Sequence, residues 1–130
     1  MSVTVAAAHE PAVIRRGDIY WIAPDEDRGA VPPIAHPYVV VQDDLFNAAR
    51  IHTVIVCGIT SNLKRMAEPG TVLLDEGEGG LHRRSVVLAS QISSVNKAQL
   101  GERTGTLAHD RVEQILAAVG FINRVHHLRD

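Results

Sequence analysis

Residues 38–62 read YVVVQDDLFNAARIHTVIVCGITSN, and this stretch decides the fold class. Its two apolar runs, residues 38–42 and 53–59, are short and rich in β-branched side chains. That combination favours buried strands over helices. Residues 44–50 between the two runs predict a short turn of helix. The centre of the chain is therefore predicted to be mainly β-structure.

Further short strands are predicted on both sides of this stretch. They cover residues 13–23, 71–74, 85–89 and 91–95. Gly17 and Asp18 mark the true start of the first strand. The last two segments are either two strands or one strand that bends near Ser90.

The C-terminal segment changes to a helical period. Its apolar residues fall at i, i+3, i+4, i+7 and i+10: Val112, Ile115, Leu116, Val119 and Ile122. This spacing predicts a helix over residues 109–123, with Thr106 followed by Asp110 and Arg111 as its N-terminal start. Phe121 and Val125 lie off the apolar stripe, and they form either a partner surface or the exposed end of a fraying helix.

The order of these elements predicts the architecture. Five or six short strands followed by one closing helix, without β-α-β alternation, predict a mainly β fold, either a small antiparallel barrel or a bent sheet. A chain of 130 residues has the length of one domain. We expect that domain to span residues 13–123, between a flexible N-terminal tail at 1–12 and a C-terminal tail at 124–130.

Composition limits the class of protein. Hydrophobic residues make up 45% and charged residues 22%, as in globular domains, and the net charge of −2 excludes a strongly basic binder of the histone type. A local basic patch is still allowed. No apolar run approaches ~18 residues, and the N-terminus is a poor signal peptide. We therefore expect a cytoplasmic protein without membrane contact.

No metal or cofactor site is predicted. None of the seven histidines has a recognised ligand spacing with cysteines or carboxylates. The sequence holds no GxSxG motif, no phosphate-binding glycine loop and no dinucleotide fingerprint. The single Cys57 lies in an apolar run without a neighbouring charge, which indicates a small core residue rather than a nucleophile.

Four short signatures occur in a fixed order along the chain. They are RGDIYW at 16–21, VVVQDD at 39–44, ITSN at 59–62 and SVVLASQISSV at 85–95. Together they resemble the MazF/PemK (Kid) toxin family of type II toxin–antitoxin systems, from about residue 14 to residue 122. The resemblance implies an SH3-like barrel, a homodimer and a metal-independent endoribonuclease. That family cuts single-stranded RNA through a 2′,3′-cyclic phosphate, and its partner is a small antitoxin with a disordered tail.

The resemblance to the family extends to individual residues of its active site. Thr60 matches the family's catalytic Thr or Ser at the end of the third strand, and Gln91 matches a glutamine that supports the site. His36 stands before Pro37, where the family usually has a catalytic arginine. The loop also departs from the family, because Gly29 is followed by Ala-Val-Pro instead of Ser-Glu-Gln.

RNA cleavage needs proton transfer and stabilisation of charge on the phosphorane. A histidine suits proton transfer, and an arginine suits a phosphate. Our hypothesis is that His36 transfers the proton and that Arg28, or another cation, balances the phosphate charge. Thr60 then holds a non-bridging oxygen or orients the nucleophile. The structural alternatives are a loop histidine packed on Pro37, a solvated arginine and a threonine that stabilises a turn.

Basic and polar residues flank these positions and are the candidates for substrate binding. They are Ser61, Asn62, Lys64, Arg65, Arg83, Arg84 and Gln91. If the fold brings their loops to one rim, they bind phosphates with an affinity that falls as salt rises. Aromatic residues are only 4% of the chain, so Tyr20, Trp21 and Phe46 are the few candidates for base stacking.

His36 also leaves a second function open. The same fold without the catalytic arginine is either a CcdB-like poison of a protein target or a degenerate MazF relative, and both are non-catalytic interaction modules. A third possibility is a barrel that binds RNA without cleaving it. Cleaved fragments, intact bound RNA or a protein partner distinguish the three.

Overall fold

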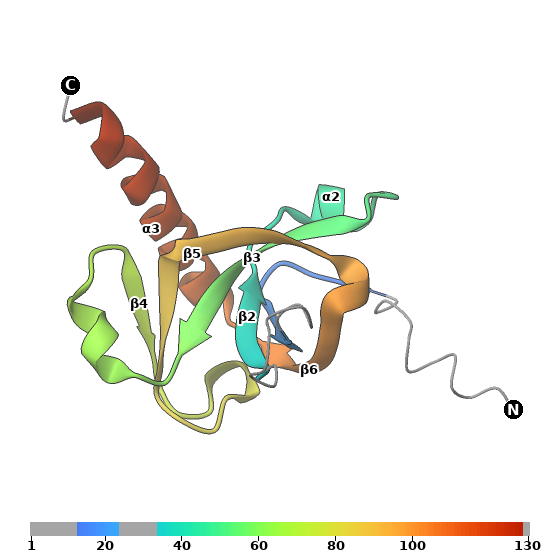
Figure 1. Cartoon of the computed structure of the whole chain (residues 1–130), viewed down its shortest axis with the longest axis horizontal. Helices are drawn as coiled ribbons and strands as arrows, with labels where there is room; N and C mark the ends of the chain where they lie inside the picture. Colours follow the sequence, from blue (N-terminus) through green and yellow to red (C-terminus); the bar gives the residue numbers. More distant parts are fainter. Residues whose placement is uncertain (1–12, 24–33, 129–130) are drawn as a thin grey trace, which may run out of the picture.

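The computed structural model describes residues 13–23 and 34–128 (Figure 1). Its six strands form one antiparallel sheet in the order β4-β5-β3-β2-β1-β6. The strands are β1 (Asp18–Ile22), β2 (His36–Val40), β3 (Thr53–Thr60), β4 (Thr71–Leu74), β5 (Ser85–Asn96) and β6 (Leu100–Thr106). The α-helices are α2 (Asp44–Asn47) and α3 (His109–Leu128), and the 3-10 helices are η1 (Leu63–Ala67), η2 (Glu78–Gly80) and η3 (Lys97–Gln99).

This architecture confirms the predicted mainly antiparallel β fold with a C-terminal helix. The two segments that meet near Ser90 are one continuous strand, β5, which arches across the molecule in Figure 1. β2 starts at His36, two residues before the predicted apolar run, and α2 ends at Asn47 instead of residue 50. The division into one domain and two tails stays a prediction.

The sequence did not predict β6. Its sequence LGERTGT contains two glycines and no apolar alternation, because most of this edge strand faces solvent. Thr106 ends this strand, which corrects its predicted role at the start of the helix. Its Oγ1 instead donates to Oδ1 of buried Asp18 at 2.6 Å.

Helix α3 begins at His109 as predicted and continues to Leu128. Residues 124–128 of the predicted C-terminal tail are therefore helical. No glycine or proline follows Asn123 to end the helix there.

The sheet curls until its two edge regions meet. η2 follows the edge strand β4, and Thr104 of the other edge strand donates its hydroxyl to the Gly79 carbonyl at 2.7 Å. Gly80 has a positive φ of 78°, and a Cβ there would lie 2.1 Å from the Thr104 carbonyl oxygen. Glycine is required at this contact, which closes the barrel-like curve and places residues 81–85 beside the ends of β1, β2 and β3.

Alternate strand residues fill two aliphatic cores. Ile19, Val39 and Cys57 face the first core, which α3 covers with Val112 and Ile115. The second core lies on the opposite face of the sheet, and its buried members are Ile14, Tyr20, Ile22, Val40, Val54, Val56 and Leu100. This alternation is what a sheet buried on both faces requires.

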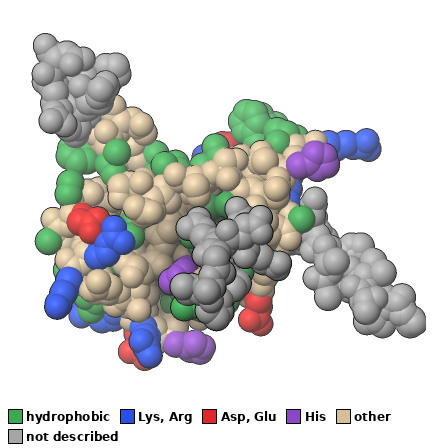
Figure 2. All heavy atoms as spheres, viewed as in Figure 1, with side chains coloured by type: hydrophobic (Ala, Val, Ile, Leu, Met, Phe, Trp, Pro, Cys, Tyr) green, Lys and Arg blue, Asp and Glu red, His purple; other side chains and the backbone are tan. Residues whose placement is uncertain are grey.

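Helix α2 projects from the sheet beside these cores. Leu45 and Phe46 are exposed, and Figure 2 shows apolar side chains gathered there. The buried Lys97 holds the end of this segment, since its Nζ donates to the carbonyl oxygens of Asn47 and Ala49 at 3.2 Å each. Across the described residues, no helix has both the length and the apolar character that crossing a membrane requires.

Candidate active-site pocket

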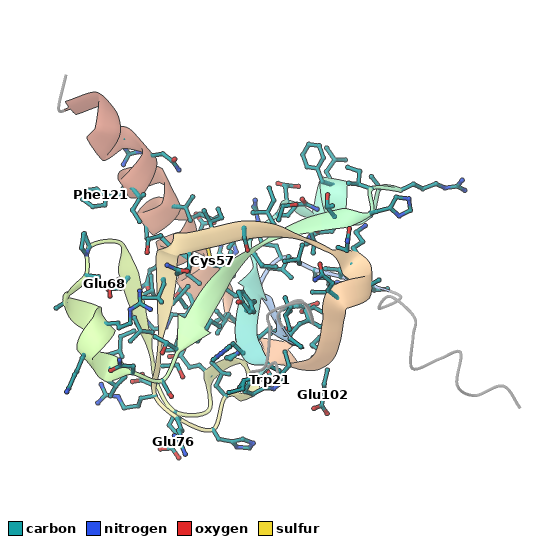
Figure 3. All side chains as sticks on the ribbon, viewed as in Figure 1. Trp21, Cys57, Glu68, Glu76, Glu102 and Phe121 are labelled. Carbon is teal, nitrogen blue, oxygen red and sulfur yellow. The ribbon has the colours of Figure 1, made fainter. Side chains whose placement is uncertain are left out.

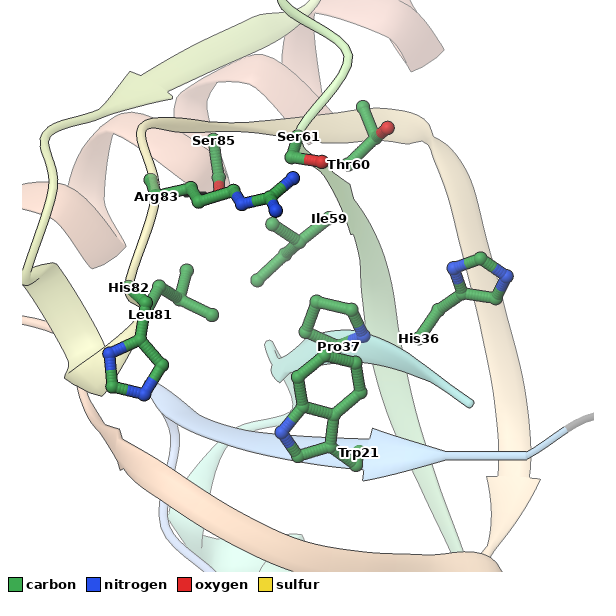
Figure 4. Close-up of a pocket in the computed structure, with 10 residues that line it drawn as sticks. All are labelled: Trp21, His36, Pro37, Ile59, Thr60, Ser61, Leu81, His82, Arg83 and Ser85. Carbon is green, nitrogen blue, oxygen red and sulfur yellow. Dashed lines mark hydrogen bonds between the residues drawn. The ribbon is translucent and has the colours of Figure 1, made fainter. Parts of the chain in front are cut away.

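A cavity of about 360 Å³ opens where three strands end (Figure 4). It is lined by Trp21, His36, Pro37, Ile59, Thr60, Ser61, Leu81, His82, Arg83 and Ser85. Four of the residues predicted as catalytic or substrate-binding therefore line one cavity: His36, Thr60, Ser61 and Arg83.

Strand pairing explains why His36 and Thr60 line the same cavity. β2 runs antiparallel to β3, and their pairing reaches Tyr38 and Gly58. His36, the first residue of β2, and Thr60, the last residue of β3, each lie two residues beyond this pair. Each short strand thus delivers its terminal side chain to the same edge, although 24 positions separate His36 from Thr60 in the sequence.

Arg83 reaches the pocket from the opposite wall. In Figure 4 its guanidinium extends over Ile59 toward Ser61. The Ser85 hydroxyl fixes the backbone beneath it by donating to the Arg83 carbonyl at 2.9 Å. Within the described part of the chain the guanidinium has no ion pair and no hydrogen bond, so it is available to an anionic ligand.

Thr60 also has a structural bond. Its Oγ1 accepts the backbone N–H of Asn62 at 3.1 Å, and Asn62 Oδ1 accepts the backbone N–H of Lys64 at 3.2 Å to cap η1. This is the turn that the structural alternative predicted. A hydroxyl that accepts one hydrogen bond keeps its own proton to donate, so Thr60 can hold the turn and contact a ligand at the same time.

The other predicted binding residues do not line this cavity. Arg65 is bound to Glu68 through two hydrogen bonds, with Nε to Oε2 at 2.6 Å and Nη2 to Oε1 at 3.1 Å. These bonds raise the pKa of Arg65 and lower that of Glu68, and they leave the arginine less free for RNA. Gln91 lies beside Gly58 and does not line the pocket.

Asn62, Lys64 and Arg84 are exposed outside the cavity. Arg28, the predicted phosphate cation, lies outside the described residues. The roles assigned to these residues and to Gln91 stay predictions.

Two features of the pocket were missed or underrated by sequence reasoning. His82 brings a second imidazole to the lining, and Trp21 contributes an indole beneath Pro37 (Figure 4). The signal for His82 was its place directly before Arg83 and Arg84. Nowhere in the described chain are three or more histidine, cysteine, aspartate or glutamate residues grouped so that they could hold a metal ion.

Comparison with curated proteins identifies relatives over most of the chain. The chain is 37% identical over 103 residues to endoribonuclease MazF6 of Mycobacterium tuberculosis, covering 79% of this chain and 90% of that protein. Endoribonuclease MazF2 of Mycobacterium bovis matches with the same identity and coverage.

Comparison with solved structures supports the fold. MazF in a MazE–MazF complex from Deinococcus radiodurans superposes with a TM-score of 0.71 at 20% identity, over 86% of this chain and 96% of that one. The toxin MazF-mt6 of Mycobacterium tuberculosis gives 0.63 at 21% identity, over 79% and 92%. The family model of the PemK-like, MazF-like toxins of type II toxin–antitoxin systems matches residues 15–122. The protein belongs to this PemK/MazF toxin family.

Proposed function

We propose that this protein is the toxin of a type II toxin–antitoxin pair and cuts single-stranded RNA, mRNA included, as a sequence-selective endoribonuclease. The observation that carries the proposal is one pocket that holds the His36 imidazole, the Thr60 hydroxyl and the unpaired guanidinium of Arg83. The 37% identity to mycobacterial endoribonucleases supports the same activity.

The proposed reaction is an intramolecular transesterification. The ribose 2′-oxygen forms a bond to phosphorus, and the bond from phosphorus to the 5′-oxygen breaks. The proton of the 2′-hydroxyl passes to a base, and the departing 5′-oxygen receives a proton. The products are a 2′,3′-cyclic phosphate and a 5′-hydroxyl. The nucleophile belongs to the substrate, so this route requires no metal and no cofactor.

Each of the three groups has one role. The His36 imidazole takes and returns the proton, because histidine changes its charge near neutral pH. Arg83 is the cation that balances the charge of the phosphate, because a planar guanidinium can bind two phosphate oxygens at once. Thr60 donates its hydroxyl proton to a non-bridging oxygen. Groups fixed before the reaction stabilise the developing charge without having to reorganise.

The proposed partners are a cognate small antitoxin and a second copy of this chain. The Deinococcus radiodurans relatives include MazE–MazF complexes, which supports the antitoxin. The exposed side chains of Ile55 and Ile92 lie on neighbouring strands β3 and β5, and this apolar face supports a homodimer. We place the activity in the cytoplasm, where mRNA is found.

The activity is tested with a random-sequence RNA library and purified protein in EDTA. Wild-type protein is expected to release fragments that end in a cyclic phosphate at a limited set of sequences. Thr60→Ser keeps the hydroxyl and should keep cleavage, whereas Thr60→Ala should lose it. Circular dichroism checks that both variants are folded, since the hydroxyl also accepts a hydrogen bond in the turn.

Two results would reject the nuclease. RNA that is bound but stays intact would indicate a barrel that binds RNA without cleaving it. RNA that is neither cut nor bound would favour the CcdB-like or degenerate interaction module, for which His36 in the arginine position is the supporting observation.

A further inference from the structure

A second cavity, of about 330 Å³, shares Trp21, Leu81 and His82 with the candidate pocket. Its remaining lining comes from β6 and Gly80, whereas the rest of the first pocket comes from β2, β3, Ser61, Arg83 and Ser85. Because β1 lies between β2 and β6 in the sheet, Trp21 of β1 separates the two cavities. Both volumes fall in the range of small-ligand sites, roughly 300–1,000 Å³.

A β-bulge shapes the second cavity. Tyr20 pairs with Arg103 and Ile22 pairs with Leu100, so two residues of β6 lie opposite the single residue Trp21. These two are Gly101 and Glu102. A Cβ on Gly101 would lie 2.7 Å from the Trp21 carbonyl oxygen, so the close approach of β6 depends on glycine. A bulge of this kind redirects the side chains around it.

The polar side chains of this cavity are not equally available. Thr104 Oγ1 donates to the Gly79 carbonyl at 2.7 Å, and Arg103 Nη1 donates to Thr106 Oγ1 at 3.0 Å. Within the described residues, Glu102 has neither an ion pair nor a hydrogen bond. Figure 3 shows Glu102 projecting outward from β6, and Trp21 lines the same cavity. Besides the His82 imidazole, which it shares with the first pocket, this cavity therefore offers an unpartnered carboxylate beside an indole.

A carboxylate accepts hydrogen bonds and repels phosphate. Glu102 thus disfavours a phosphate here, whereas Arg83 favours one in the first pocket. The Arg103 guanidinium that also lines the second cavity is held toward Thr106 and lies 3.9 Å from Asp18. Single-stranded RNA is recognised through bases that stack on aromatic side chains and form hydrogen bonds along their Watson–Crick edge. An indole and a free carboxylate are the two groups that such recognition of a donor-rich base requires.

We propose that this second cavity binds a guanine base of the RNA, at a nucleotide that flanks the one held in the candidate pocket. Guanine is the RNA base with two adjacent donors on its Watson–Crick edge, N1–H and the N2 amino group, and these match the two oxygens of Glu102. Adenine and cytosine present one donor group beside an acceptor, and uracil presents one N–H between two acceptors. The indole of Trp21 stacks on the base. This inference rests on the proposed action on RNA and adds a residue that determines its sequence preference.

Binding of uncleavable oligonucleotides tests the inference without any need for catalysis. The probes are 2′-fluoro hexanucleotides of uridine with one guanine placed at each position in turn. They lack the attacking 2′-hydroxyl, and the tightest binder is then remade with inosine, which lacks the N2 amino group. Dissociation constants come from fluorescence anisotropy of the labelled probe. The only tryptophan of the chain, Trp21, reports stacking through quenching of its emission.

We expect guanine to bind the wild type about tenfold more tightly than inosine, and Glu102→Gln to reduce this ratio to below about threefold. Glu76→Gln is the matched control, since Glu76 is an exposed acid outside both cavities and should retain the full ratio. Trp21 emission should be quenched by the guanine probe.

Three results would overturn the inference: no binding of any probe, equal binding of guanine and inosine by the wild type, or a preference that survives Glu102→Gln. The same experiments distinguish failure of the guanine site from failure of the proposed nuclease activity. RNA cleaved without a Glu102-dependent guanine preference would reject only the second cavity. A Glu102-dependent preference in a protein that does not cleave would support the cavity and reject the nuclease.

Discussion

Arg111 binds Glu78 through two parallel hydrogen bonds, with Nε to Oε1 at 2.9 Å and Nη2 to Oε2 at 2.8 Å. The arginine belongs to α3, and the glutamate belongs to η2, shortly before His82 and Arg83 in the chain. The same guanidinium lies 3.6 Å from Asp75. The C-terminal helix thereby fastens the segment that forms one wall of the candidate pocket.

This ion pair predicts a pH-dependent stability. The Arg111 hydrogen bonds hold the pKa of Glu78 below its usual value. A carboxyl group with a lowered folded-state pKa stabilises the fold above its unfolded pKa, and this contribution is lost as the pH falls through the folded pKa. Glu78→Gln should reduce the free energy of unfolding by about 1 kcal/mol at pH 7 and by less in acid. Urea denaturation at pH 7 and in acid measures both values.

Glu76→Gln serves as the control for this prediction, because Glu76 is exposed in the same turn. It should leave the free energy of unfolding nearly unchanged at both pH values. An equal loss of stability for Glu78→Gln at pH 7 and in acid would contradict the assigned cause.

Arg83 and Arg84 should differ in their effect on RNA binding. Arg83 lines the candidate pocket, and its neighbour does not. Arg83→Ala should weaken the binding of an uncleavable RNA by about tenfold at low salt and flatten its salt dependence, because one phosphate contact is lost. Arg84→Ala should change both quantities less. Anisotropy titrations at several salt concentrations decide, and equal effects of the two substitutions would indicate a diffuse basic surface.

His36 should control the rate of cleavage more than the affinity for RNA. His36→Ala is expected to lower the single-turnover rate by about 100- to 10,000-fold, the usual contribution of a proton-transfer residue. His36→Arg restores the arginine of the family and should keep part of the activity. His52→Ala is the control, since His52 lies outside the pocket. Cleavage by His36→Ala at the wild-type rate would reject the assignment.

The strands that the sequence predicted best are those with apolar side chains to bury. β3 lies inside the sheet and extends one residue beyond its prediction, to Thr60, and the edge strand β4 has the predicted bounds because it buries Val72 and Leu74. The other edge strand, β6, was missed because it buries few side chains and is held by backbone pairing with β1. Pairing between distant segments leaves little trace in the strand's own residues.

The candidate site also has a part that the sequence could predict and a part that it could not. The apolar runs left His36 and Thr60 just outside the predicted strands. The strands extend to both residues, and antiparallel pairing brings these strand ends to one edge. Lys64 and Arg65 looked equivalent to Arg83 in sequence. The turn of η1 instead joins Arg65 to Glu68, and only the closure of the sheet brings Arg83 to the pocket. Whether a loop cation is free or paired depends on turn geometry, which composition does not encode.

Cys57 should be inert in the folded protein. Its side chain is fully buried in the first core, and burial raises the pKa of the thiol to about 11. The thiolate, which is the reactive form, is therefore rare at pH 8. We expect a thiol reagent to label Cys57 completely in denaturant and negligibly in buffer, with Cys57→Ala as the unlabelled control. Rapid labelling in buffer would mean that β3 and β5 separate readily at the register shift between Cys57 and Gly58. The pocket edge formed by Thr60 would then be less rigid than preorganised catalysis requires.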